Sequence, residues 1–161
     1  MQRGDKMNKL EELLQEAEDE NITVIDYHFE SNRIKGLYCN GTIALKDNIE
    51  TTAEKARILS EELGHHYTTV GNIINQNYIE NRKQEQCARG LAYNKMIGLF
   101  GIVKAYEHGC QSLHETADYL NVTEEFLKEA LTYYKNKHGI YTTVDNYIIY
   151  FEPSLGVGKL I

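Results

Sequence analysis

A helical period of apolar residues opens the chain. Leu10, Leu13, Leu14 and Ala17 recur at i, i+3, i+4 and i+7. This spacing places the four side chains on one face and predicts an amphipathic helix over residues 7–19. We expect that face to pack on the core.

Short β-branched runs replace the helical period after this helix. They occupy residues 22–27, 33–39 and 42–45, and Asn40-Gly41 separates the last two. This dipeptide between two apolar runs is a strong hairpin signal. The pattern therefore predicts a small antiparallel sheet of about three strands.

The helical period returns in the middle of the chain. Thr51 and Glu54 have the spacing of a capping box, which predicts a helix that runs to about His66. Polar residues 67–78 then predict a loop. A long helical segment follows over about residues 79–107, in which Gly98 and Gly101 indicate a kink or a close crossing.

Two short helices and a hairpin are predicted at the C-terminal end. The helices cover residues 112–120, beginning at a capping box of Ser112 and Glu115, and 124–138, ending at Gly139. Strands at 140–144 and 147–151 follow. The helix pair resembles a helix-turn-helix, but its second helix begins with acidic residues, whereas DNA recognition requires basic ones. We interpret Phe126 and its apolar neighbours as core that packs on the long helix.

Composition narrows the class of protein. The chain has 161 residues, a net charge of −7 and 42% hydrophobic residues, which is typical of one globular domain and disfavours general nucleic-acid binding. We find no apolar run of membrane-span length and no signal peptide, and therefore expect no membrane association and a cytoplasmic location. The three cysteines lack metal-site spacing and are expected to be buried free thiols.

One stretch of the second helix carries candidate metal chemistry. In Glu61-Glu62-Leu63-Gly64-His65, the first and last residues lie one helical turn apart. A zinc-protease helix of the H-E-x-x-H type has two metal ligands at this spacing and a glutamate base beside the first. Here Glu61 stands at the first ligand position in place of histidine, Glu62 at the base position and His65 at the second ligand position.

The alternative register of this motif is chemically poorer. If Glu62 and His66 bound the metal, the base position would fall on Leu63, which cannot accept a proton. His66 is also turned by about 100° from His65 around the helix. We interpret His66 as a residue beside the site or at the surface.

A catalytic zinc needs a third protein ligand. Glu85 is our best candidate, because it lies twenty positions after His65 and is followed by Ala88 and Ala92, which would allow two helices to approach closely. The rival ligands are His28, His108 and His114.

An ordered set of segments resembles the ImmA/IrrE family of metallo-endopeptidases of bacterial mobile elements, prophages and radiation-response systems. The segments are Lys35-Gly36-Leu37-Tyr38, Ile43-Ala44-Leu45, residues 56–66 and Glu85-x-x-Ala88-x-x-x-Ala92. The similarity covers roughly residues 20–110. The resemblance implies a zincin-like metalloprotease domain. Together with the predicted elements it gives an α+β fold that is mainly helical, with a small antiparallel sheet before the metal helix and a C-terminal β-hairpin. We expect one domain over residues 1–161, with a core at 1–110 and an extension at 111–161.

The resemblance also implies a function. Glu61, His65 and Glu85 would bind Zn²⁺ and Glu62 would be the general base of an endopeptidase. The expected substrate is a protein, namely a helix-turn-helix repressor of a phage or mobile element. The sequence departs from the family at Glu61, which replaces the usual histidine. A second carboxylate ligand would make the zinc a weaker Lewis acid. The alternative is therefore a weakly active or inactive member that acts as a protein-binding anti-repressor or a DNA-binding regulator.

Overall fold

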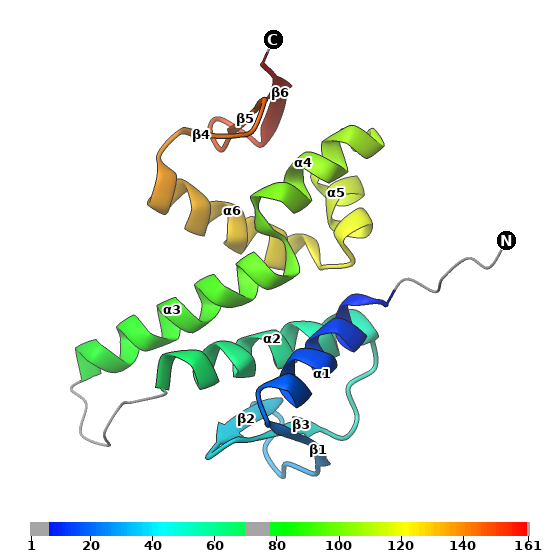
Figure 1. Ribbon diagram of the computed structural model, residues 1–161, viewed down its shortest axis with the longest axis vertical. Coiled ribbons are helices and arrows are strands. Elements are labelled where there is room, and N and C mark those ends of the chain that lie inside the picture. The colour runs from blue at the N-terminus through cyan, green and yellow to red at the C-terminus, as the bar shows by residue number, and fades with distance from the viewer. Residues whose placement is uncertain (1–6, 70–77, 161) are drawn as a thin grey trace, which may run out of the picture. The chain divides into compact units, whose positions relative to one another are not determined.

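The computed structural model describes residues 7–69 and 78–160 (Figure 1). The chain divides into two compact units, Met1–Ala92 and Tyr93–Ile161. The first unit holds α1 (Lys9–Asp19), β1 (Thr23–Tyr27), β2 (Gly36–Cys39), β3 (Thr42–Lys46), α2 (Thr52–Thr69) and most of α3 (Tyr78–Met96). The second holds the end of α3, then α4 (Gly98–His108), α5 (Leu113–Leu120), α6 (Glu124–His138), β4 (Tyr141–Val144), β5 (Tyr147–Tyr150) and β6 (Gly156–Lys159). The α+β class is confirmed. The single 1–161 domain stays a prediction, and its expected internal boundary near residue 110 lies inside the second unit.

The sheet of the first unit is mixed, with strand order β1-β3-β2. The predicted hairpin of β2 and β3 is confirmed, and its turn residues Asn40 and Gly41 have the positive φ angles of 45° and 78° that a tight hairpin requires. β1 differs from the prediction, because it runs parallel to β3. β3 lies between β1 and β2 in the sheet, so β1 has β3 as its neighbour instead of β2. The alternation of apolar and polar side chains along a strand does not specify which strand lies next to it.

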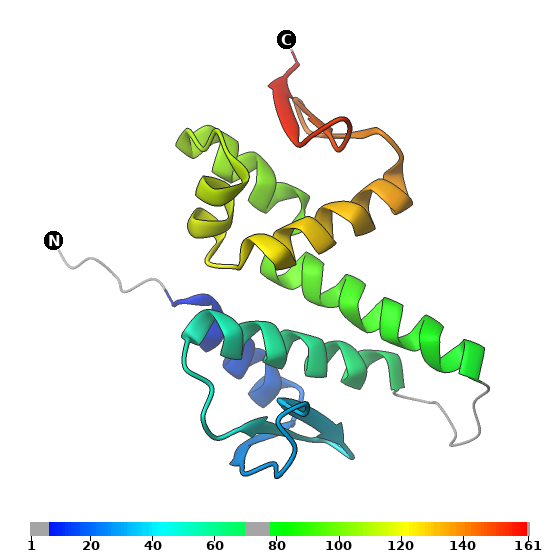
Figure 2. The same cartoon turned by 180° about the vertical axis from the view of Figure 1, so that it is seen from behind.

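Helices α1 and α2 supply the core of the first unit together with β3. Asn8 caps α1 through a complete capping box with Glu11, and the helix buries Leu13 and Ala17. α2 packs against α1 and against β2 and β3, as Figure 2 also shows. The buried apolar side chains of α2 and β3 in this core are Ala56, Ile58, Leu59, Leu63, Ile43 and Leu45.

Helix α2 is longer than its sequence pattern predicts. The backbone N–H of Glu54 donates to Thr51 Oγ1 over 3.1 Å, which confirms the predicted start. The helix continues to Thr69, so the prediction of a loop from residue 67 is wrong for its first three residues. The rest of that loop up to residue 77 lies outside the described residues.

The second unit begins within α3, and its helices break where the glycine pattern indicated a kink. α3 ends at Met96, and α4 begins at Gly98, whose φ of 66° is easy only for glycine. Ser112 caps α5 as predicted, and Thr123 caps α6. Phe126 packs on Tyr93 with the ring centroids 5.2 Å apart. The C-terminal hairpin of β4 and β5 is confirmed, and the glycine-rich β6, which was not predicted, adds a third strand.

No helix in the described part of the chain is both long and apolar enough to cross a membrane. The three cysteines are free, as expected. Their predicted burial is wrong, because Cys39 and Cys87 are exposed and Cys110 is half-buried. Cys39 is the last residue of the edge strand β2, where one side is left open to solvent.

Candidate functional site

The core-facing residues of α2 determine where its acidic and histidine side chains lie. Ser60, Leu63 and Gly64 are buried, and Ser60 donates its hydroxyl to the Arg57 carbonyl over 2.6 Å. Glu61 and His65 are one turn apart, and their side chains are 30% and 26% exposed. Both can therefore reach a ligand while remaining attached to a rigid helix.

A close approach of two helices brings Glu85 to this face. A Cβ added at Gly64 would lie 2.5 Å from the carbonyl oxygen of Ala88, so only glycine fits where α2 meets α3. His65 Nε2 consequently lies 3.5 Å from Glu85 Oε1. Two ligands that bind a tetrahedral zinc at about 2.0–2.1 Å are themselves separated by about 3.3 Å. The His65–Glu85 pair therefore has the spacing of two ligands of one ion.

Glu62 lies under the edge strand of the sheet. A Cβ at Gly36 would lie 3.1 Å from Glu62 Cγ, so the glycine leaves room for this side chain beneath β2. Burial, together with the negative charges of Glu61 and Glu85, raises the pKa of Glu62 from 4.5 to about 7, against a smaller lowering by a hydrogen bond from the Tyr38 backbone. A carboxyl group with a pKa near neutrality can both accept and return a proton, as a general base must.

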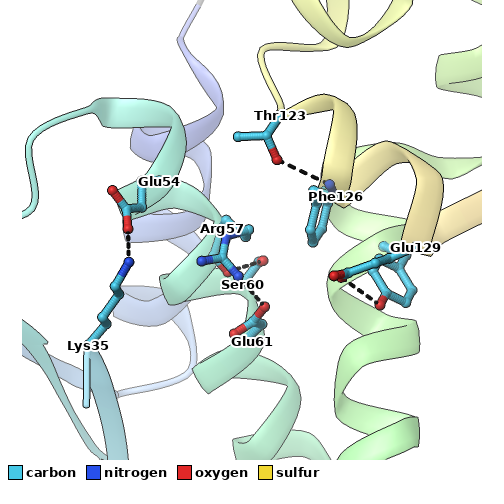
Figure 3. Close-up of polar contacts among 9 residues, drawn as sticks. Lys35, Glu54, Arg57, Ser60, Glu61, Thr123, Phe126 and Glu129 are labelled. Carbon is cyan, nitrogen blue, oxygen red and sulfur yellow. Dashed lines mark hydrogen bonds and ion pairs between the residues drawn. The ribbon is translucent and has the colours of Figure 1, made fainter. Parts of the chain in front are cut away.

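Glu61 forms an ion pair with Arg57 (Figure 3). Arg57 Nη1 lies 3.0 Å from Glu61 Oε1, at the i, i+4 spacing of neighbours on one helix face. Among the described residues, no three His, Cys, Asp or Glu side chains form a ready metal-binding group. Of the three ligands expected from the sequence, His65 and Glu85 lie at ligand spacing, whereas the Glu61 carboxylate is paired with Arg57. The imidazole and carboxylate groups of these residues are donor types that zinc accepts.

The other histidines have different surroundings. His66 Nδ1 lies 2.8 Å from the Tyr38 hydroxyl, and its Nε2 lies 3.7 Å from Glu20. These contacts place His66 between β2 and the end of α1, beside the candidate site.

The three rival ligands have other partners. His28 lies 3.2 Å from Asp47 on an exposed turn. Two rivals of Glu85, His108 and His114, belong to the second unit, where His108 packs on Tyr119 and His114 contacts Glu124.

The contacts of two residues near the motif were not predicted from the sequence. Arg57 was detectable, because an arginine four residues before a glutamate on a predicted helix is an expected ion pair. Tyr38 was not, because its contacts with Glu62 and His66 depend on how β2 crosses α2. No local pattern reports such a crossing.

An acid and an imidazole on one helix, an adjacent base, and a second acid from the next helix are the elements of a metal-dependent hydrolase site. The family model of the IrrE N-terminal-like domain, a peptidase family, matches residues 17–132. The chain therefore belongs to the ImmA/IrrE family and contains its metallopeptidase-type domain. Neither the curated proteins nor the solved structures contain a significant match.

Proposed function

We propose that this protein is a zinc-dependent endopeptidase in which Glu61, His65 and Glu85 hold the metal and Glu62 is the general base. The observation that carries the proposal is the 3.5 Å separation of His65 Nε2 and Glu85 Oε1 from two different helices. The family supports a metallopeptidase and hence a metal cofactor. The placement of the individual roles is our inference from the geometry of the site.

The chain's own residues would divide the work of amide hydrolysis. When bound, zinc would polarise the scissile carbonyl and acidify the attacking water. Glu62 would take a proton from that water and give it to the departing amine, and its pKa near 7 suits both transfers. The Tyr38 backbone N–H holds the Glu62 carboxylate in place during this exchange.

We further propose a protein substrate, namely a helix-turn-helix repressor of a phage or mobile element, cleaved in the cytoplasm. The support for this substrate is the resemblance to the ImmA/IrrE family. The acidic net charge of −7 agrees with a partner that is a protein rather than a nucleic acid.

Metal analysis of the purified protein tests the ligand set. We expect about one zinc per chain, and loss of the zinc in His65→Ala and Glu85→Ala. His28→Ala is the matched control, because it removes an exposed histidine of the same unit and should leave the zinc content unchanged. A protein that contains no zinc and takes up none when it is added would overturn the proposal.

The role of Glu62 requires a separate variant. Glu62→Gln should retain zinc, because its side chain is not a ligand, and should lose at least about a hundredfold of the activity, as expected for a missing general base. The measurement is cleavage of a peptide library followed by mass spectrometry. Cleavage at the wild-type rate in Glu62→Gln would remove Glu62 from the mechanism.

The Arg57–Glu61 ion pair favours a second candidate function. If Arg57 holds Glu61 permanently, the site lacks a ligand, and the protein acts by binding a repressor without cleaving it. This candidate predicts the same repressor affinity for wild type and Glu62→Gln, with an intact repressor in both complexes. Intact-mass measurement of the repressor separates the two functions.

A further inference from the structure

The ion pair between Arg57 and Glu61 has a consequence for metal loading. Arg57 Nη1 is 3.0 Å from Glu61 Oε1, and the side chains of both residues are 30% exposed. The guanidinium is thus a fixed positive charge at the carboxylate that the proposed function assigns to the metal. His65 Nε2 and Glu85 Oε1, the other two proposed ligand atoms, lie 3.5 Å apart.

We propose that Arg57 is an internal competitor for Glu61, so that the metal is bound only after it displaces the arginine from this carboxylate. This inference rests on the proposed function. It adds a means by which loading depends on the zinc concentration, and it follows from the geometry in Figure 3, where Arg57 and Glu61 project from successive turns of one helix.

Magnitudes favour a competitor that can be displaced over a permanent block. A partly exposed i, i+4 ion pair changes an equilibrium constant by at most about fivefold, whereas a zinc ligand contributes far more. The arginine would also repel a divalent cation nearby by an amount of similar size. Together the two effects should weaken zinc binding by about tenfold without abolishing it.

The site also has a reason to contain such a cation. Glu61, Glu62 and Glu85 place three carboxylates near one another, and in the usual motif the first position is a neutral histidine. Arg57 offsets the additional negative charge of Glu61 in the metal-free protein. In the metal-free protein, the positive charge of Arg57 thus neutralises the Glu61 carboxylate that the metal would otherwise neutralise.

Zinc affinity, measured by competition with a chromogenic chelator, tests the proposal. Arg57→Gln should bind zinc about tenfold more tightly than wild type, and Arg57→Lys, which keeps the charge, should stay close to wild type. Lys55→Gln is the matched control, because it removes a positive charge from the same helix that pairs with Asp26 instead of Glu61. Unchanged or weaker affinity in Arg57→Gln would overturn the inference.

A double-mutant cycle shows whether Arg57 acts through Glu61. In a Glu61→His background the carboxylate is gone, and Arg57→Gln should gain only about threefold from the reduced charge repulsion. An equal tenfold gain in both backgrounds would mean that Arg57 acts as a distant charge and would also refute competition.

The outcomes separate this inference from the proposed function. If wild type binds zinc and Arg57→Gln binds it no more tightly, the inference fails and the proposed function stands. If only Arg57→Gln binds zinc, Arg57 blocks the site permanently, which overturns both displacement of the arginine by the metal and the proposed function of the wild-type protein. If neither binds zinc, both fail.

Discussion

Replacing Glu62 with glutamine in the metal-free protein should remove a large pH dependence of stability. The pKa of Glu62 is raised from 4.5 to about 7 by burial and by the charges of Glu61 and Glu85. Between these two values the folded protein keeps a proton that the unfolded chain has released. The free energy of unfolding therefore falls as the pH rises through this window and is fully restored below it.

The magnitude follows from the width of that window. One pH unit corresponds to about 1.4 kcal/mol, so ionisation of Glu62 should cost the folded state about 3 kcal/mol at about pH 8. Glutamine is nearly the same size and keeps an oxygen for the Tyr38 backbone N–H, but it cannot ionise. Glu62→Gln should thus match wild type near pH 4.5 and exceed it by up to about 3 kcal/mol at about pH 8.

Urea unfolding in the presence of a chelator, repeated from about pH 4.5 to 8.5, measures this difference. Glu54→Gln is a control of opposite sign, because the hydrogen bond from Lys35 lowers the pKa of Glu54, and this stabilisation is lost as the pH falls. Curves of wild type and Glu62→Gln that stay parallel over the whole range would refute the reasoning, because they would show that Glu62 ionises equally easily in both states.

Two further substitutions, one in each unit, test a close helix contact and a buried hydrogen bond. Gly64→Ala should destabilise the protein by about 1–3 kcal/mol despite the better helix propensity of alanine, because its Cβ would lie 2.5 Å from the Ala88 carbonyl oxygen. Gly101→Ala is the control, because its Cβ would meet only the flexible end of Leu120 at 3.2 Å, and urea midpoints that are equal for both variants would contradict the argument. Tyr134→Phe should lower the free energy of unfolding by about 1–2 kcal/mol, because the hydroxyl of this buried ring donates a hydrogen bond of 2.9 Å to Asn94 Oδ1. An unchanged urea midpoint would show that this hydrogen bond contributes nothing to stability.

The elements that the sequence predicted well are those whose signals are local. The hairpin turn at Asn40-Gly41, the helix cap at Ser112 and the helix end at Gly139 each depend on the φ angle or side chain of one or two residues. These preferences act in any context, and the structure confirms all three. The glycine-rich β6 escaped prediction for the converse reason, since its pairing with β5 supplies the order that its own residues lack.

The remaining differences between the predicted and the observed elements arise from contacts between residues that are far apart in the sequence. β1 pairs parallel to β3 because β3 enters the sheet between two earlier strands, and neither strand's side-chain pattern specifies its neighbour. α2 extends to Thr69 although its last residues are weak helix formers, and Tyr67 there donates a hydrogen bond to Glu16 of α1. A tertiary contact of this kind outweighs a small local preference.

By itself, the sequence determined the chemical inventory of the site: two adjacent acids and a histidine at helical spacing, and a glycine that permits a close helix crossing. The tertiary structure decided how that inventory is arranged. It brought Glu85 to within 3.5 Å of His65, and it placed Glu62 beneath β2, where burial raises its pKa to about 7. The reason is physical, because helical spacing is a property of adjacent residues, whereas ligand distance and burial depend on segments that meet only when the chain has folded.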